Sequence, residues 1–270
     1  MSRRRLDGIC AVTIDFGNTL VPVRRAALRE VVARTSATTC AHLGLGEPGA
    51  FVAAWAEERE RQFREEVPRF REVDLRQRAV RVIARLRGFP VPQPDGPWDD
   101  DSAAAWSTGD EVDDLLSTYS EAFVAVVPAP PASGMVMADL AARGFRVAIL
   151  SNWPLAATID RFVEAAGWRP LLTEVFVSER IGTIKPHPAI FAHAAAELDV
   201  ATGAILHVGD DWAADVVGAI RAGWRAAYLR DHQGDTPLPT SARSHDGDVA
   251  PDLELHDLAE LGAQLGDPSP

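Results

Sequence analysis

The sequence predicts an α/β fold in which a parallel sheet forms the core and a helical module is inserted into it. Three observations predict this fold. A short apolar run near the N-terminus is followed by a long stretch with helical periodicity; strand-like and helix-like segments alternate beyond residue 134; and polar side chains collect where the expected strands end. A chain of 270 residues accommodates one large domain with such an insertion.

The first element is a buried strand. Residues Ile9–Ile14 are apolar and β-branched and lie between Gly8 and Gly17, which is typical of such a strand. Helices are expected next, because apolar residues recur at three- and four-residue intervals. Their ranges are 24–45, 50–67, 72–87 and 110–126. The proline-rich stretch 88–101 cannot continue a helix and is expected to be a loop.

The second half alternates between strands and helices, which predicts a parallel sheet with crossover helices. Strands are expected over residues 145–150, 174–177, 204–208 and 226–229, and helices over 155–166, 188–198 and 212–222. A polar, mobile stretch from about Asp231 to Asp248 precedes one more short strand and helix. The expected division is a core of residues 1–20 and 131–270 and a helical module of residues 21–130.

Composition excludes several classes of function. The chain is 47% hydrophobic and 24% charged, with a net charge of −12, so no global basic field exists to hold a nucleic acid or an anionic membrane. The uncharged run 122–138 contains several prolines and cannot be a spanning helix. Cys10 and Cys40 are too few for a disulfide framework. We expect a cytoplasmic protein with no nucleic-acid or membrane partner; no sequence feature decides its oligomeric state.

Residues that can take part in catalysis or binding follow four of the expected strands. They are Asp15, Gly17 and Thr19 after the first strand, Ser151 and Asn152 after the second, Lys185 after the third, and Asp210, Asp211 and Asp215 after the fourth. Ligands of open α/β sheets bind at this edge. Carboxylates from two strand ends are suitable ligands for Mg²⁺, and one of them can act as a nucleophile. Lys185 is the chain's only lysine among 27 lysine and arginine residues.

In this order, the four motifs Asp15-x-Gly17-x-Thr19, Ser151-Asn152, Lys185-Pro186 and Gly209-Asp210-Asp211-x3-Asp215 resemble those of the haloacid dehalogenase superfamily, subfamily I. The resemblance implies a Rossmann-like core with a helical cap of the C1 type inserted after the first strand. It also implies a Mg²⁺-dependent phosphatase that hydrolyses a small phosphomonoester metabolite through an aspartyl-phosphate on Asp15.

The resemblance also assigns roles to single residues. Asp15 is the expected nucleophile, assisted by Ser151 and Lys185. Phosphate binding is expected from Thr19, Ser151, Asn152 and Lys185. Asp15, the Gly17 carbonyl and Asp210 are the expected Mg²⁺ ligands. Asp211 and Asp215 are expected beside them, as a further ligand or as groups that orient Lys185 or water.

The sequence departs from the phosphatase pattern at Gly17, where family phosphatases usually carry a second aspartate that acts as general acid and base. General acid–base catalysis is worth about 10²- to 10⁴-fold in rate. The dehalogenases of the family also lack this aspartate, but they carry uncharged residues where this chain has Asp210 and Asp211. A dehalogenase-type hydrolase, or a weakly active or non-catalytic ligand-binding protein, is therefore the alternative.

Several neighbouring residues have plainer interpretations. Asp211 is as well suited to cap the following helix as to contact a metal. His207 is expected to be a hydrogen-bonded core residue, and Trp153 is expected to close the seam between core and cap. Three arginines of the helical module are expected on a solvated face: Arg64, Arg76 and Arg81.

Overall fold

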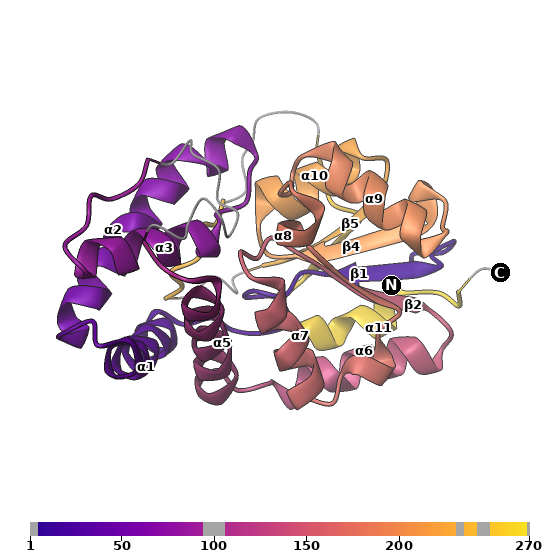
Figure 1. The fold of residues 1–270 in the computed structure, drawn as a ribbon. Coiled ribbons are helices and arrows are strands. Elements are labelled where there is room, and N and C mark those ends of the chain that lie inside the picture. Colours follow the sequence, from indigo (N-terminus) through magenta and orange to yellow (C-terminus); the bar gives the residue numbers. More distant parts are fainter. Residues whose placement is uncertain (1–4, 94–105, 231–234, 242–248, 269–270) are drawn as a thin grey trace.

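The computed structural model describes residues 5–93, 106–230, 235–241 and 249–268 (Figure 1). Six parallel strands form one sheet in the order β3-β2-β1-β4-β5-β6. The strands are β1 (Ala11–Ile14), β2 (Arg146–Ser151), β3 (Glu174–Val177), β4 (Ile205–Gly209), β5 (Arg225–Leu229) and β6 (Leu253–Leu255). The predicted α/β fold with a parallel sheet is confirmed.

Strand β1 lies at the centre of the sheet and is buried on both faces, as its continuous apolar sequence predicts. It pairs with β2 on one side and with β4 on the other, with Ile14 opposite Ile149 and Val208. This register brings the ends of the three strands to the same edge. The residues that follow them in the chain therefore meet there.

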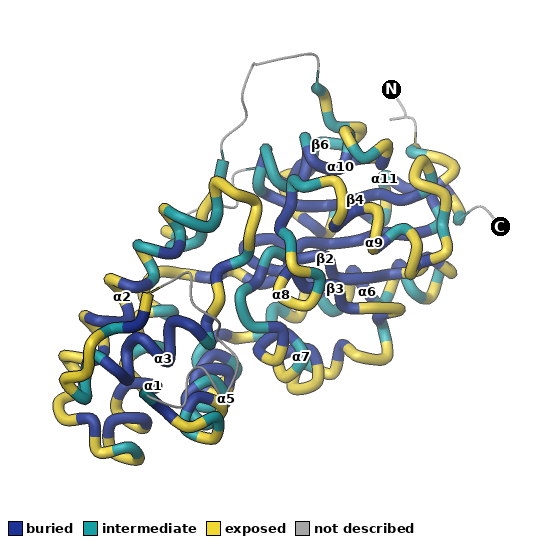
Figure 2. Tube along the Cα trace, turned by 45° about the horizontal axis from the view of Figure 1, so that its top comes forward, coloured by how far each residue is buried: buried dark blue, intermediate teal, exposed yellow. Residues whose placement is uncertain are grey.

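Helices cover both faces of the sheet (Figure 1). One face carries α6 (Pro131–Ala142), α7 (Ala156–Ala165) and α11 (Leu261–Gln264), and its apolar cluster includes Val12 and Ile14. The other face carries α9 (Pro188–Leu198) and α10 (Gly218–Arg221), which belong to a second cluster with Ala11. The short helix α8 (Ser178–Ile181) follows β3. Figure 2 shows the strands as the most continuously buried part of the core.

Helices α1 (Arg25–Leu43), α2 (Pro48–Glu65), α3 (Leu75–Leu86) and α5 (Gly109–Val126) form a separate layer, which we call the helical module (Figures 1 and 2). Their bounds differ by three residues or fewer from the predicted helices. Thr108 and Glu111 form a capping box that fixes the start of α5. The Asp74 side chain accepts a hydrogen bond from the Gln77 N–H and starts α3 in the same way.

Two features of the core differ from the prediction. Helix α6 begins at Pro131, where the proline-rich stretch had indicated only a boundary; proline is well suited to the first position of a helix because its missing N–H needs no partner there. The helix predicted over 212–222 is divided into a π-helical turn, Trp212–Val217, and α10.

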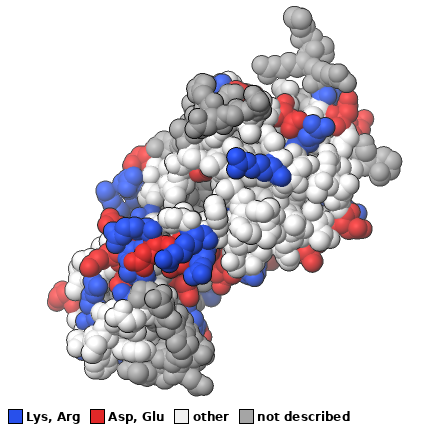
Figure 3. Space-filling model, turned by 90° about the horizontal axis from the view of Figure 1, so that it is seen from above, with Lys and Arg blue, Asp and Glu red and all other residues white. Residues whose placement is uncertain are grey.

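The three arginines expected on a solvated face differ from one another. Arg64 is exposed, and Arg76 is half-buried beside Asp113. The prediction is wrong for Arg81, which is buried and donates to Glu58 through Nε and Nη2. Figure 3 shows basic and acidic side chains interleaved over part of the helical module, and such interleaving does not reveal which pairs lie beneath the surface.

No single described helix is long and apolar enough to cross a membrane. Helices α5 and α6 reach the required length and composition only as a pair, and that pair is bent by 94°.

Candidate active site

Four of the predicted site residues meet at the carboxyl ends of the strands. Asp15 follows β1, Ser151 ends β2, Asp210 follows β4, and Lys185 lies in the loop between α8 and α9. All four are buried and all four line the same cavity. The sheet topology therefore brings together residues that lie up to 195 positions apart in the sequence.

Lys185 lies at the centre of the site. Its ammonium group donates to Asp15 Oδ1 at 2.8 Å, to Asp215 Oδ1 at 2.7 Å and to the Leu150 carbonyl at 2.7 Å. Burial alone would lower the pKa of Lys185, but the two carboxylates outweigh burial and raise it above its ordinary value. Lys185 is therefore a permanent cation at neutral pH.

The carboxylates of the site crowd one another. Burial and the charge of Asp215 raise the pKa of Asp15 to about 6, although Lys185 opposes the shift. Burial and the charges of Asp15 and Asp215 raise the pKa of Asp210 to about 8. One carboxylate oxygen from each of Asp15, Asp210 and Asp215 lies within 4.8 Å of the others. This set of hard oxygen donors fits a divalent cation such as Mg²⁺.

Asp215 is engaged by protein groups. It accepts hydrogen bonds from Lys185 and the Asp211 N–H, and its Oδ1 lies 3.1 Å from His207 Nε2. Lys185 and His207 lower the pKa of Asp215 in spite of its burial. A Cβ atom on Gly209 would lie 2.1 Å from Asp215 Oδ2, so only glycine permits this close approach. The arrangement fits the predicted role of Asp215 in orienting Lys185.

His207 is the hydrogen-bonded core residue that the sequence predicts. Thr13 Oγ1 lies 2.8 Å from its Nδ1, and the ring is fully buried. Burial and the neighbouring Lys185 lower the pKa of His207. Asp211 caps the helical turn that follows it, because its Oδ1 accepts from the Ala214 N–H at 2.8 Å.

The three remaining predicted residues are placed as follows. Thr19 Oγ1 donates to Asp210 Oδ1 at 3.0 Å and does not line the cavity. The Asn152 side chain accepts from the Lys185 N–H at 2.7 Å and donates to the Lys185 carbonyl at 3.0 Å, which fixes the backbone that carries the ammonium group. Gly17 lines the cavity beside Trp153, whose ring packs between Phe16 of the core and Phe123 of α5. Trp153 thus closes the predicted seam.

The cavity above these residues has a volume of about 760 Å³ and lies between the core and the helical module. The module contributes apolar and aromatic side chains from α1, α2 and α5, and its cations on the cavity wall are Arg25, Arg29, Arg59 and Arg78. Glu72 also lines it; its carboxylate accepts from the Val73 N–H at 2.9 Å, and burial raises its pKa. Helical periodicity shows that these helices pack together, but it does not show which polar side chain faces a cavity.

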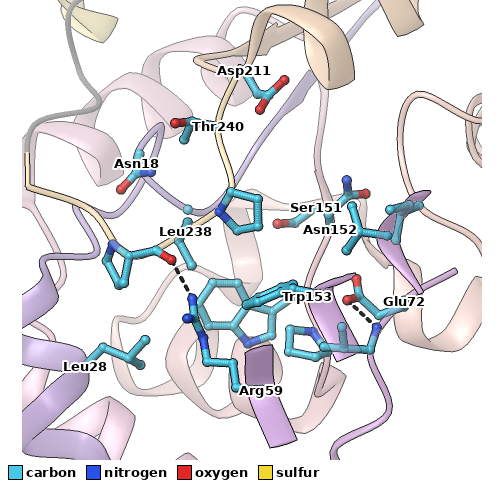
Figure 4. A pocket seen from close by; sticks show the side chains of 18 of the residues that line it. Asn18, Leu28, Arg59, Glu72, Ser151, Asn152, Trp153, Asp211, Leu238 and Thr240 are labelled. Carbon is cyan, nitrogen blue, oxygen red and sulfur yellow. Dashed lines mark hydrogen bonds between the residues drawn. The ribbon is translucent and has the colours of Figure 1, made fainter. Parts of the chain in front are cut away.

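Residues 235–241, which we call the strap, cover one side of the cavity (Figure 4). Ser241 donates to Asp211 from its N–H and its hydroxyl, and Arg59 donates to the Pro237 carbonyl. The side chain of Leu238, labelled in Figure 4, lies against the backbone of Gly17. These residues fall in the stretch predicted to be mobile; the rest of that stretch, 231–234 and 242–248, lies outside the described residues.

A comparison with known protein families matches residues 9–223 to the haloacid dehalogenase-like hydrolases. The chain belongs to this family. The match spans all four motifs recognised in the sequence, and the chain is therefore a haloacid dehalogenase-like hydrolase. Hydrolases of this family generally use a divalent metal, and the cluster of buried aspartates is compatible with one.

Curated relatives of this hydrolase include phosphatases. The chain is 35% identical over 115 residues to 5-amino-6-(5-phospho-D-ribitylamino)uracil phosphatase YigB of Escherichia coli, a match that covers 42% of the chain and 46% of that protein. It is 27% identical over 220 residues to phosphatase MT3486 of Mycobacterium tuberculosis, covering 72% of the chain and 91% of that protein.

Among solved structures, the hydrolase resembles a 2-haloacid dehalogenase from Pseudomonas syringae pv. Tomato. The two share 25% sequence identity with a TM-score of 0.65, over 95% of this chain and 97% of the other. The likeness thus extends through the helical module as well as the core.

Proposed function

We propose that the chain is a Mg²⁺-dependent phosphatase that hydrolyses a small phosphomonoester at Asp15. One observation carries the proposal: Asp15 lies on the cavity wall between a permanent cation, Lys185, and a second buried carboxylate, Asp210. A carboxylate nucleophile beside a cation-binding carboxylate suits attack on an anionic phosphate, because the bound charges offset the repulsion between the reactants. The two curated phosphatase relatives support the same assignment.

In this mechanism an Asp15 carboxylate oxygen attacks phosphorus, and the bond from phosphorus to the leaving-group oxygen breaks. The leaving group takes a proton from water and departs as an alcohol, because Gly17 offers no acid for this step. Water then attacks the aspartyl-phosphate, the bond between phosphorus and Asp15 breaks, and phosphate is released. With a pKa of about 6, Asp15 is mainly ionised at neutral pH and ready to attack.

Asp15, Asp210 and the Gly17 carbonyl would hold Mg²⁺, which supplies positive charge to the phosphate oxygens when bound. The Ser151 hydroxyl and Lys185 would bind phosphate oxygens at the opposite side, where charge increases in the transition state. Asn152 would support phosphate binding indirectly, because its side chain fixes the backbone of Lys185. Thr19 would support it by orienting the carboxylate of Asp210. Asp211 and Asp215 hold the strap and Lys185 in place.

We propose the same division of the chain as the sequence indicates, with residues 21–130 as a C1-type cap over a core of residues 1–20 and 131–270. The cap would exclude water from the reacting groups and select the substrate. Its contribution of about half the cavity wall supports this role. We further infer that the protein acts in the cytoplasm on a diffusible small molecule; its net charge of −12 provides no basic field to hold a nucleic acid or an anionic membrane.

The test is phosphate release from an activated aryl phosphate and a phosphomonoester panel, with Mg²⁺ and with chelator. We expect release only with Mg²⁺, and a loss of at least 10³-fold in Asp15→Asn, consistent with removal of a nucleophile. The exposed Asp113→Asn on α5 is the matched control and should retain full activity. Circular dichroism of Asp15→Asn checks that the variant is folded. Halide release from a 2-haloacid in chelator would instead establish the dehalogenase alternative.

A further inference from the structure

Arg78 on α3 is a buried cation on the cavity wall. The residue is 4% exposed, its Nε donates to Gln62 Oε1 at 2.8 Å, and its guanidinium lies 5.1 Å from the centre of the Trp55 ring. Its Nη2 is buried and has no hydrogen-bond partner. A buried charged donor without a partner is costly, so its presence calls for an explanation such as a bound ion, water or ligand.

Arg81, one turn further along α3, shows what a structural arginine looks like in this module. Its guanidinium contacts both oxygens of Glu58, which also accepts from Arg61. Glu58 is thereby fully engaged, and Glu72 on the cavity wall accepts from Ser178 and the Val73 N–H. In the described part of the chain, no carboxylate forms an ion pair with Arg78.

The surroundings of Arg78 favour an anion. Burial lowers the pKa of Arg78 to about 10, and the positive charge of Arg59 adds to the shift, whereas Tyr119 and Glu58 oppose it. Arg78 also attracts Glu72, whose pKa it lowers against the effect of burial. Both arginines remain charged at neutral pH. Both line the cavity, together with Tyr119, whose ring packs on Trp55 at 5.8 Å. An anion between the two guanidinium groups would relieve their repulsion.

The module wall also carries the charged residues Arg25, Arg29, Glu60 and Glu72. Beside them it is apolar, with Leu28, Val32, Val52 and Phe63. The opposite wall carries the proposed phosphate site. Arg78 therefore lies on the wall of the cavity that faces the leaving group rather than among the strand-end residues that bind the transferred phosphate.

We propose that Arg78 binds a second anionic group of the substrate, a carboxylate or a second phosphate, at the module wall of the cavity. The proposal rests on the phosphatase function and deepens it. The substrate class is a phosphomonoester whose leaving group carries an anion beyond an apolar or ring-shaped part.

The test compares aryl phosphates with different far ends: para-tolyl phosphate, para-carboxyphenyl phosphate and hydroquinone bisphosphate. The bisphosphate offers two equivalent scissile phosphates, and this factor of two cancels when wild type and variant are compared. We expect Arg78→Gln to lower the ratio of kcat/KM between an anionic substrate and the tolyl ester by about tenfold or more, as for loss of a charged hydrogen bond. A drop for the carboxylate alone or for the bisphosphate alone identifies the anion. The exposed Arg64→Gln is the control and should keep the wild-type ratio.

Two further measurements separate binding from folding and from chemistry. Arg78→Met should lose less stability than Arg81→Met, so that Arg81→Met unfolds at the lower denaturant concentration. Arg78→Met gives up the hydrogen bond to Gln62, whereas Arg81→Met leaves the buried carboxylate of Glu58 without its partner. In the Asp15→Asn background, para-toluate should raise the unfolding temperature, and Arg78→Gln should abolish that shift.

The outcomes distinguish the two proposals. Metal-dependent phosphate release with equal substrate ratios in wild type and Arg78→Gln overturns the anion site and leaves the phosphatase standing. Stabilisation by para-toluate that depends on Arg78, without phosphate release from any ester, supports the anion site and overturns the phosphatase function.

Discussion

At residue 17 the backbone passes close to Leu238 of the strap. A Cβ atom there would lie 2.7 Å from Leu238 Cδ1 and 3.5 Å from Trp153 Cζ3. The space that an aspartate side chain would enter is thus filled by an apolar group from a distant segment. Leu238 can pack here because residue 17 is a glycine and lacks the second aspartate of the family phosphatases.

Gly17→Asp alone should therefore give little gain in the rate of phosphate release. The double variant Gly17→Asp/Leu238→Ala should have a higher kcat than Leu238→Ala alone. We expect about tenfold or more on alkyl phosphates, whose poor leaving groups need a proton most, and less on activated aryl phosphates. Steady-state kcat on both substrate types measures the effect. An equal gain in the single variant would show that Leu238 does not control access to this position.

At the scale of elements, one carboxylate joins α2 to α3. Glu58 is 2% exposed and lies 2.7 Å from Arg81, 2.9 Å from Arg61 and 3.5 Å from Arg85. Burial would raise the pKa of Glu58, but hydrogen bonds from Arg81 and Arg61 outweigh burial and lower it below 4.5. The pair of helices that carries Arg59 and Arg78 therefore depends on this charge.

Glu58→Gln should lower the free energy of unfolding by roughly 3 kcal/mol at pH 7, because it leaves buried arginines without their partner. Since the pKa is lower in the folded state, the contribution of Glu58 is complete above about pH 4.5 and is lost as the pH falls through the folded-state value. The difference between wild type and variant should shrink towards pH 3. Urea denaturation at several pH values measures it.

Glu57→Gln provides the matched control. Glu57 contacts Arg85, but its side chain is exposed, so its loss should cost well under 1 kcal/mol at any pH. A pH-independent loss in Glu58→Gln would contradict the assigned ionised state of Glu58.

At the scale of the whole molecule, the site depends on three segments distant in sequence. The core supplies the carboxylates, the helical module supplies arginines, and the strap connects them through Arg25 to Asp235 and through Ser241 to Asp211. Anything that reduces repulsion among the carboxylates should stabilise the assembled form against unfolding.

Mg²⁺ should therefore raise the unfolding temperature of the wild-type protein, and chelator should reverse the rise. Asp210→Asn should abolish most of the rise, whereas Asp113→Asn, on the module surface, should preserve it. Calorimetry measures both. An undiminished shift in Asp210→Asn would place the metal elsewhere.

The sequence predicted the sheet and the positions of Asp15, Ser151, Lys185 and Asp210, because buried strands have clear patterns and topology fixes where their ends meet. It did not predict the strap, since packing of residues 235–241 onto Gly17 is a tertiary contact without periodicity. It also could not separate Arg78 from Arg81. Both lie on α3, and only the position of Glu58 on another helix decides which one is paired.

Because Lys185 is buried, its chemical modification can be used to detect local opening of the structure around it. It is the only lysine, it is 2% exposed, and its amine is held by three acceptors. Apart from the α-amino group, the folded protein thus offers acylating reagents no accessible primary amine. Acylation of Lys185 requires the loop and strand ends to separate, so its rate, followed by mass spectrometry, measures the free energy of opening at the candidate active site.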